Sequence, residues 1–223
     1  MIEVKNLTKS YVFKGKRLYV FKDLNFKLDR GSSVALLGKN GAGKSTLLRL
    51  IGGIDQPDSG SITADCSVSW PVGLIGGFQG SLSARENVTF VSKIYSGSDS
   101  DSFEEKVERV AEFADIGSYF EKPFKTYSSG MAARVTFGLS MAFNFDVYLL
   151  DEVTGAGDAK FREKCKKILK EKQTNSDFIM VNHNLWGLKF NCDKALLLDN
   201  GKIMEFDSLK DGIKEHKRLL GIN

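Results

Sequence analysis

The sequence predicts an α/β protein with a mostly parallel core sheet, and three patterns along the chain support this. An apolar strand pattern at residues 33–37 leads through a glycine-rich loop into a helical pattern that ends at Gly52 and Gly53. After residue 147, strand and helix patterns alternate, as they do where helices connect parallel strands. Between about residues 83 and 145 the pattern is mostly helical, which indicates a helical subdomain inserted into the α/β core.

The order of elements follows from hydrophobic periodicity. Residues 2–11 and 19–28 alternate between apolar and polar positions like half-buried strands, so the chain opens with sheet. A turn is expected at 56–60, and the polar run 96–102 is expected to be an exposed connection. The later part predicts strands at 147–150, 178–181 and 195–198, with helices at 159–173 and near 185–190.

Length and composition set the broad class. The 223 residues suit one domain, 1–223, and 42% hydrophobic and 27% charged residues are ordinary for a globular protein. A net charge of +4 argues neither for nucleic acid nor for a membrane surface. We expect no membrane-spanning helix and no secretion signal. The cysteines Cys66, Cys165 and Cys192 lack a metal-binding spacing and are expected to be reduced thiols in the cytoplasm.

The glycine-rich loop has the pattern G-x-x-x-x-G-K-[ST] between a strand and a helix, which indicates an ATP phosphate site. Its glycines turn the backbone N–H groups inward, and the helix N-terminus adds positive charge. Lys44 is expected to reach the β- and γ-phosphates and Ser45 to bind Mg²⁺. The alternative is a glycine-rich turn with a solvated lysine. The loop consists of Gly38, Lys39, Asn40, Gly41, Ala42, Gly43, Lys44, Ser45 and Thr46.

Two carboxylates and a histidine follow later strands. Asp151 and Glu152 end the strand pattern at 147–150, so we predict them at the carboxyl edge of the sheet. Asp151 suits the Mg²⁺ shell, and Glu152 suits the general base that accepts a proton from the attacking water. His183 follows the next strand and is predicted to contact the γ-phosphate. The alternatives are carboxylates that only end a strand in solvent and a structural histidine, and His216 is expected to be a solvated surface residue.

These motifs, in this order, resemble the ATP-binding subunits of ABC transporters over nearly the whole chain. The resemblance implies a P-loop NTPase of ABC type, with an N-terminal antiparallel β subdomain and an inserted helical subdomain. It implies that Tyr11 stacks on adenine, with an ordinary strand aromatic as the alternative. It also implies that Gln79 senses Mg²⁺ and faces a membrane partner.

The same resemblance assigns a second group of residues to an ATP-bound dimer. Residues 127–131 look like the family's Leu-Ser-Gly-Gly-Gln signature, although Ser129 and Met131 depart from it. Ser128 and Gly130 would therefore contact ATP held by the opposite subunit. Asp158 matches the loop that links the two sites. Two copies would sandwich two ATP molecules and drive a separate integral membrane permease.

The stretch 70–82, followed by 85–88, is similar to ATPases that export capsular polysaccharide of the polysialic acid type in Gram-negative bacteria. This implies a peripheral position at the cytoplasmic face of the inner membrane, with the polysaccharide handled by the permease. The alternatives are an O-antigen or teichoic acid exporter, or a glycine-rich surface loop in any ABC subunit.

Two hypotheses from other classes remain. A soluble ABC protein acting on nucleic acid or ribosomes generally carries paired ATPase units or long coiled-coil inserts, and the sequence shows neither, so no nucleic-acid partner is expected. A subunit that binds ATP without turnover is the other hypothesis, because the signature is altered. The basic helix at 159–173 could meet anionic lipid, but such runs are usually solvated faces.

Overall fold

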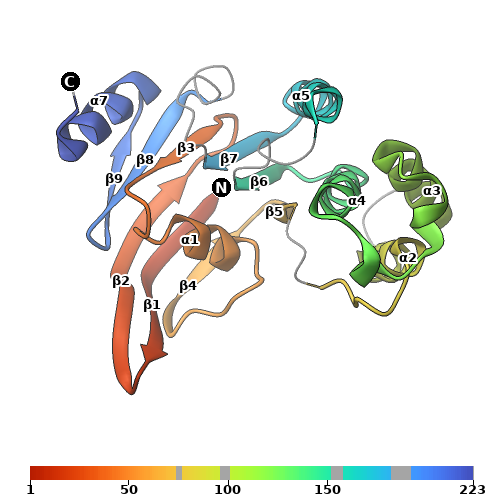
Figure 1. Ribbon diagram of the computed structural model, residues 1–223. Coiled ribbons are helices and arrows are strands. Elements are labelled where there is room, and N and C mark those ends of the chain that lie inside the picture. Colours follow the sequence, from red (N-terminus) through yellow and green to blue (C-terminus); the bar gives the residue numbers. More distant parts are fainter. Residues whose placement is uncertain (74–76, 96–100, 152–157, 182–191, 223) are drawn as a thin grey trace. The chain divides into compact units, whose positions relative to one another are not determined.

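The computed structural model describes residues 1–73, 77–95, 101–151, 158–181 and 192–222 (Figure 1). The chain divides into two compact units. Unit 1 comprises Met1–Pro71, Phe145–Glu152 and Gln173–Asn223, and unit 2 comprises Val72–Asn144 and Val153–Lys172.

Unit 1 begins with an antiparallel sheet in the order β2-β1-β4. Its strands are β1 (Ile2–Phe13), β2 (Lys16–Leu28) and β4 (Ser59–Ala64). β1 and β2 form a long ribbon, drawn in red and orange in Figure 1, whose register runs from Ile2 opposite Leu28 to Phe13 opposite Lys16. The prediction of antiparallel N-terminal strands is confirmed. The ribbon extends past residue 11 because backbone pairing continues where the side chains no longer alternate in burial.

The second sheet of unit 1 has six strands in the order β5-β6-β7-β3-β8-β9. β6, β7, β3 and β8 pair in parallel, and β9 is antiparallel to β8, so the prediction of a mostly parallel core sheet is confirmed. The strands are β3 (Val34–Leu37), β5 (Val68–Val72), β6 (Val147–Asp151), β7 (Asp177–Val181), β8 (Lys194–Asp199) and β9 (Lys202–Phe206).

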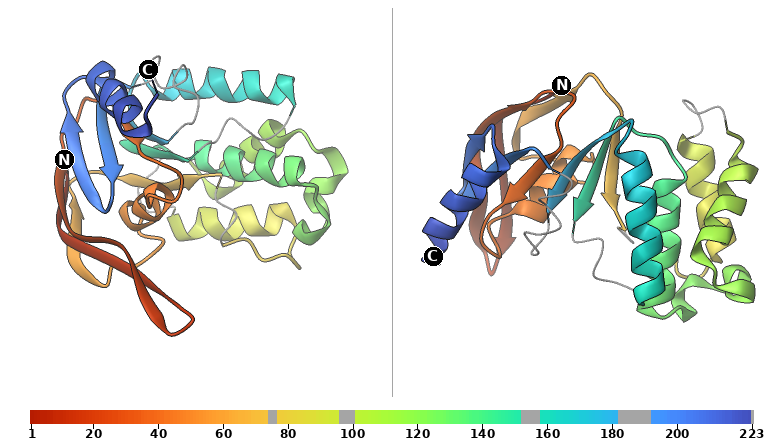
Figure 2. Two further views of the ribbon diagram at one scale, coloured as in Figure 1. Left: turned by 60° about the vertical axis from the view of Figure 1, so that its left-hand side comes forward. Right: turned by 90° about the horizontal axis from the view of Figure 1, so that it is seen from above.

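The core of unit 1 includes helix α1 (Lys44–Ile51), which follows β3. Four of its eight residues are buried, and they pack with apolar side chains from both sheets in one hydrophobic cluster. A second helix, α7 (Leu209–Leu220), packs on β3, β8 and β9 (Figure 2). Trp70 and Val72 are buried in β5, so the alternative that the whole stretch 70–82 is a surface loop is wrong for its first residues.

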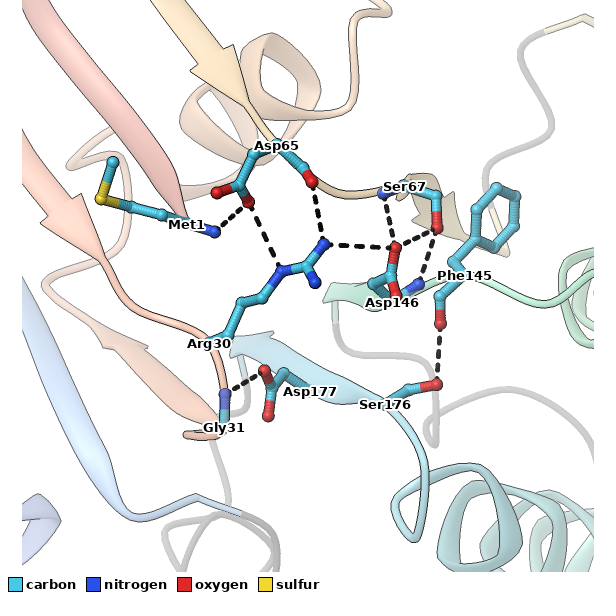
Figure 3. A network of polar contacts seen from close by, with 9 residues as sticks. All are labelled: Met1, Arg30, Gly31, Asp65, Ser67, Phe145, Asp146, Ser176 and Asp177. Atoms are coloured by element: carbon cyan, nitrogen blue, oxygen red, sulfur yellow. Dashed lines mark hydrogen bonds and ion pairs between the residues drawn. The ribbon is translucent and has the colours of Figure 1, made fainter. Parts of the chain in front are cut away.

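Polar contacts tie together the amino ends of the parallel strands (Figure 3). The Arg30 guanidinium donates to the carbonyl oxygen of Asp65 at 2.9 Å and pairs with the Asp146 carboxylate at 3.8 Å. That carboxylate accepts from both the backbone N–H and the hydroxyl of Ser67, each at 2.8 Å. The Gly31 N–H donates to Asp177 at 2.7 Å. These bonds anchor the strands at the edge opposite to the one where their carboxyl ends lie.

Unit 2 is helical in its described part. It contains α2 (Ala84–Tyr95), α3 (Phe103–Ala114), the short 3₁₀ helices η1 (Gly117–Glu121) and η2 (Phe124–Thr126), α4 (Ser129–Met141) and α5 (Ala159–Lys172). Ser102 and Glu105 form a capping box at the start of α3, which ends the polar run predicted as a connection. α3 packs against both α2 and α4. Among the residues that the structure describes, none of the helices combines the length and apolar character needed to cross a bilayer.

Candidate functional site

The predicted phosphate loop leaves the middle of the six-stranded sheet. β3 is buried along its whole length and pairs in parallel with β7 on one side and β8 on the other. Open parallel sheets bind ligands in the crevice outside the carboxyl ends of their strands. The loop after Leu37 therefore begins where a ligand site of this fold is expected.

Two glycines of the loop are required both by backbone conformation and by space. Gly38 has a φ of 150°, and a Cβ at this position would lie 2.5 Å from the carbonyl oxygen of Leu198. Gly43 has a φ of 102°, and its Cβ would lie 2.3 Å from Cγ1 of Val20. Residues with a side chain rarely adopt such φ values. These glycines let the loop approach β8 and β2 closely.

The N-terminus of α1 is suited to an anion. Its N-cap residue, Gly43, provides no side-chain hydrogen bond, and the first turn contains no acidic residue. The first N–H groups of a helix have no acceptor within the helix, and the helix dipole adds partial positive charge there. The Lys44 ammonium donates to the carbonyl oxygens of Gly38 at 2.9 Å and Lys39 at 3.0 Å, so it lies across the same loop. This geometry fits a bound phosphate group.

A cavity of about 540 Å³ lies beside the loop. Its walls are residues 19–22 of β2, residues 39–42 of the loop and residues 199–202 of the turn between β8 and β9. Its cationic side chains are Lys22, Lys39 and Lys202, and its acidic side chain is Asp199. Small-molecule sites commonly measure about 300–1,000 Å³. Size and charge therefore suit an anionic ligand as large as a nucleotide.

Tyr11, the predicted adenine platform, lies on β1 with 45% of its surface exposed. Its hydroxyl donates to the Asp55 carboxylate at 3.0 Å, and the Lys9 ammonium lies 5.2 Å from the ring centroid. Lys9 also bonds to Asp55 at 2.8 Å, and this bond, followed by that of Tyr11, lowers the pKa of Asp55. The ring is therefore oriented by a polar cluster and keeps an exposed surface for stacking.

Asp151 ends β6 and lies opposite Val181 of β7 in the parallel register. With β7 between β6 and β3, Asp151 is at the same sheet edge as the phosphate loop. The predicted catalytic residues Glu152 and His183 lie outside the described residues. Among the residues that the structure describes, no group of three or more His, Cys, Asp or Glu side chains forms a metal site. A Mg²⁺ ion held by Ser45 and Asp151 would take further ligands from phosphate and water, as Mg²⁺ commonly does.

Gln79 belongs to unit 2, and its backbone is fixed by a buried asparagine. The Gln79 N–H donates to Oδ1 of Asn87 at 2.7 Å, and Nδ2 of Asn87 donates back to the Gln79 carbonyl at 3.1 Å. Asn87 is only 2% exposed. We did not predict this asparagine from the sequence, because a polar residue in a helical pattern carries no signal of the partner it binds.

The signature residues lie at the start of α4 in unit 2. Ser128 is the N-cap, and its hydroxyl oxygen accepts from the Met131 N–H at 3.2 Å. The hydroxyl proton remains available to a further acceptor. Gly130 lies in the first turn, and the position of its Cβ is open apart from the Ser128 hydroxyl at 4.0 Å. This helix end can therefore receive a phosphate group.

Asp158, the predicted linker residue, connects α5 with α4. Its carboxylate accepts from the Phe161 N–H at 2.8 Å and from the Arg134 guanidinium at 2.7 Å. The hydrogen bond from the Phe161 N–H is the main cause that lowers the pKa of Asp158. Arg134 lies one turn beyond the signature, and its role as the partner of Asp158 was not predicted. His216 is half-buried on α7 and not solvated as expected.

The chain is similar to known ATP-binding proteins of transport systems. The family model described as ABC transporter matches residues 21–155. The chain is 55% identical to the polysialic acid transport ATP-binding protein KpsT of Escherichia coli over 97% of this chain and 96% of that protein. It is 40% identical to the capsule polysaccharide export ATP-binding protein CtrD of Neisseria meningitidis, over 98% of this chain and the full length of CtrD.

A solved dimeric ATP-binding cassette, in a post-hydrolysis state bound to ADP and Pi, has a similar fold. Its TM-score is 0.76 at 24% identity, with 94% of this chain and 99% of that chain covered. Together with the family match, this confirms the predicted ABC-type fold. The chain belongs to the ABC transporter family and is an ATPase of that family.

Proposed function

We propose that this chain is the ATPase subunit of a capsular polysaccharide export system, of the type that transports polysialic acid. The observation that carries the proposal is the phosphate loop and its cationic cavity in a chain so similar to KpsT and CtrD. The whole chain 1–223 would act as one ATPase domain with an inserted helical subdomain at about 83–145. It would work at the cytoplasmic face of the inner membrane, with a separate permease that handles the polysaccharide.

The loop residues 38–46 would bind the phosphates of ATP. The backbone N–H groups at the start of α1 and the Lys44 ammonium supply the positive charge, and phosphate would replace the carbonyl oxygens that now accept from Lys44. Tyr11 would stack on adenine through its exposed ring face. Ser45, Asp151 and Gln79 would bind Mg²⁺, which offsets the charge on the phosphates.

Glu152 would accept the proton of the attacking water, and His183 would contact the γ-phosphate. Their sequence positions support these roles. Asp151 and Val181 lie opposite each other at the carboxyl edge of the sheet. Glu152 comes directly after Asp151, and His183 comes two residues after Val181. Ser128 and Gly130 of a second copy would close the site over the γ-phosphate. Asp158 would link this closure to α4 through Arg134.

Purification of the tagged chain from solubilised membranes of its own cell tests the transport assignment. We expect a small polytopic membrane protein to copurify, and we expect loss of capsule at the cell surface when Lys44→Ala replaces the wild type. Retention on RNA or DNA without a membrane partner, with capsule intact in the variant, would reject the proposal in favour of a soluble ABC protein.

A further inference from the structure

Helix α7 places a polar residue on its inward face beside the phosphate loop. Leu209, Gly212 and Ile213 are the buried residues of this helix, and they share one face at the spacing i, i+3, i+4. The next position of that face is i+7, which is His216. A half-buried histidine thus continues a stripe of packed residues towards the far end of the helix.

Contacts within unit 1 fix the direction in which this stripe runs. The Leu209 N–H donates to the carbonyl oxygen of Asp193 at 2.7 Å, so α7 begins where β8 begins. One turn later, a Cβ on Gly212 would lie 2.4 Å from Cβ of Ala195 and 3.5 Å from Leu37, the last residue of β3. α7 therefore runs in the same direction as β8 and β3, towards their carboxyl ends.

His216 lies four residues beyond Gly212, a rise of about 6 Å along the helix axis. At that level β3 has become the phosphate loop, where Gly38 packs against the carbonyl oxygen of Leu198. We propose that His216 is a further residue of the nucleotide site, where its protonated ring adds positive charge next to the bound phosphates. This inference rests on the proposed binding of nucleotide at the loop.

The charges around the imidazole agree with this position. Burial, followed by the Lys44 ammonium, lowers the pKa of His216, and Lys39 acts in the same direction while Asp199 opposes it. On α7 itself, the neighbouring Glu215 is paired with Arg218 at 2.6 Å. Without an anion, burial and then the two lysines of the phosphate loop lower the pKa of the His216 ring and so disfavour the imidazolium. Bound phosphates would reverse the sign of the local field and favour the imidazolium.

The consequence is uptake of a proton with nucleotide. Since the pKa of His216 would be higher in the complex than in the free protein, affinity for nucleotide would be greatest at low pH and would fall as the pH rises through the pKa of the complex. Each unit of difference between the two pKa values strengthens binding about tenfold at low pH. We expect a loss of about threefold or more in affinity between pH 6 and pH 8.

Nuclear magnetic resonance of the imidazole signals tests this with the full chain and Mg-ADP. The chain has two histidines, so His216→Gln identifies the signal of His216. We expect its titration midpoint to lie below that of a free histidine without nucleotide and to rise when Mg-ADP is added. Calorimetry of Mg-ADP binding in buffers with different heats of ionisation should show proton uptake by the wild type and less by His216→Gln.

Two further variants separate this role from a structural one. Lys214→Gln removes a charge from the exposed side of the same helix and should keep the pH profile of the wild type. His216→Lys should bind Mg-ADP tightly without the fall between pH 6 and pH 8. A midpoint that Mg-ADP leaves unchanged, while calorimetry shows binding, would overturn the role of His216. Absence of Mg-ADP binding by the wild type would overturn the proposed nucleotide site as well.

Discussion

Replacement of Gly130 by alanine should separate the function of the signature helix from its stability. Gly130 lies within α4, and its Cβ would meet nothing nearer than the Ser128 hydroxyl at 4.0 Å. Alanine loses less backbone entropy than glycine when a helix folds, which favours alanine by up to about 1 kcal/mol. We therefore expect the free energy of unfolding of Gly130→Ala to equal or exceed that of the wild type.

Hydrolysis should nevertheless fall in this variant. If Ser128 and the backbone around Gly130 close over the γ-phosphate of a second copy, a methyl group at this position would hold the phosphate away from its donors. Loss of one donor to a developing negative charge commonly costs roughly a hundredfold in rate. Binding of ATP to the monomer should be unchanged, because the phosphate loop is intact.

Gly138 of the same helix supplies the matched control. Its Cβ would lie 2.9 Å from the Phe113 ring, so Gly138→Ala overpacks the interior of unit 2, and such changes cost about 1–3 kcal/mol. Urea unfolding and steady-state phosphate release should be measured for both variants. If Gly130→Ala hydrolyses ATP at the wild-type rate, Gly130 does not face the phosphate. If Gly130→Ala unfolds as easily as Gly138→Ala, the position of the added Cβ is not open.

Three further predictions concern the phosphate site and the sheet. Lys44→Ala should weaken ATP binding by about tenfold or more in equilibrium titration, because a hydrogen bond to a charged group is lost, and undiminished affinity would count against the loop. Glu152→Gln should slow phosphate release by roughly a hundredfold or more while ATP still binds and dimers accumulate on gel filtration, and unchanged turnover would exclude Glu152 as the base. The Ser67 hydrogen bonds lower the pKa of Asp146, so its stabilisation is present above the ordinary carboxyl pKa and is lost as the pH falls below it. Acid unfolding of Asp146→Asn should therefore depend less steeply on pH below about pH 4 than that of the wild type, and identical profiles would contradict this role.

The sequence predicted best what is decided locally. The β3, loop and α1 unit could be located because an apolar strand, a glycine pattern and a helix follow one another within 20 residues of the chain. The parallel strands were found because each is an apolar run that is buried on both faces. Their shared carboxyl edge, with Asp151 opposite Val181, follows from the alternation of strands and helices.

Elements and contacts that depend on residues far away in the sequence were not predicted. Five of the six residues of β4 are exposed, so its pairing with β1 leaves no periodicity in its sequence. Helix α7 did carry a signal, since Leu209, Ile213 and His216 share one face, but its many charges suggested a solvated tail. The pairing of Arg134 with Asp158 depends on the packing of unit 2, which no local pattern records.

The two helix ends of the proposed site differ in a way that explains why one copy could bind ATP and two would be needed to hydrolyse it. α1 begins at a glycine that offers no side-chain acceptor, so no capping side chain competes with an external anion for the N–H groups of its first turn. α4 begins at Ser128, whose hydroxyl already accepts from the Met131 N–H. A phosphate at α1 can therefore accept from the N–H groups of the first turn without replacing a capping side chain, whereas a phosphate at α4 gains the Ser128 hydroxyl proton and the N–H groups that Ser128 does not bind. Binding energy should accordingly come mainly from the phosphate loop. The weaker contact at α4 then suits a surface that must close on ATP and open again after hydrolysis, because a ligand shifts such an equilibrium only by its difference in affinity for the two states.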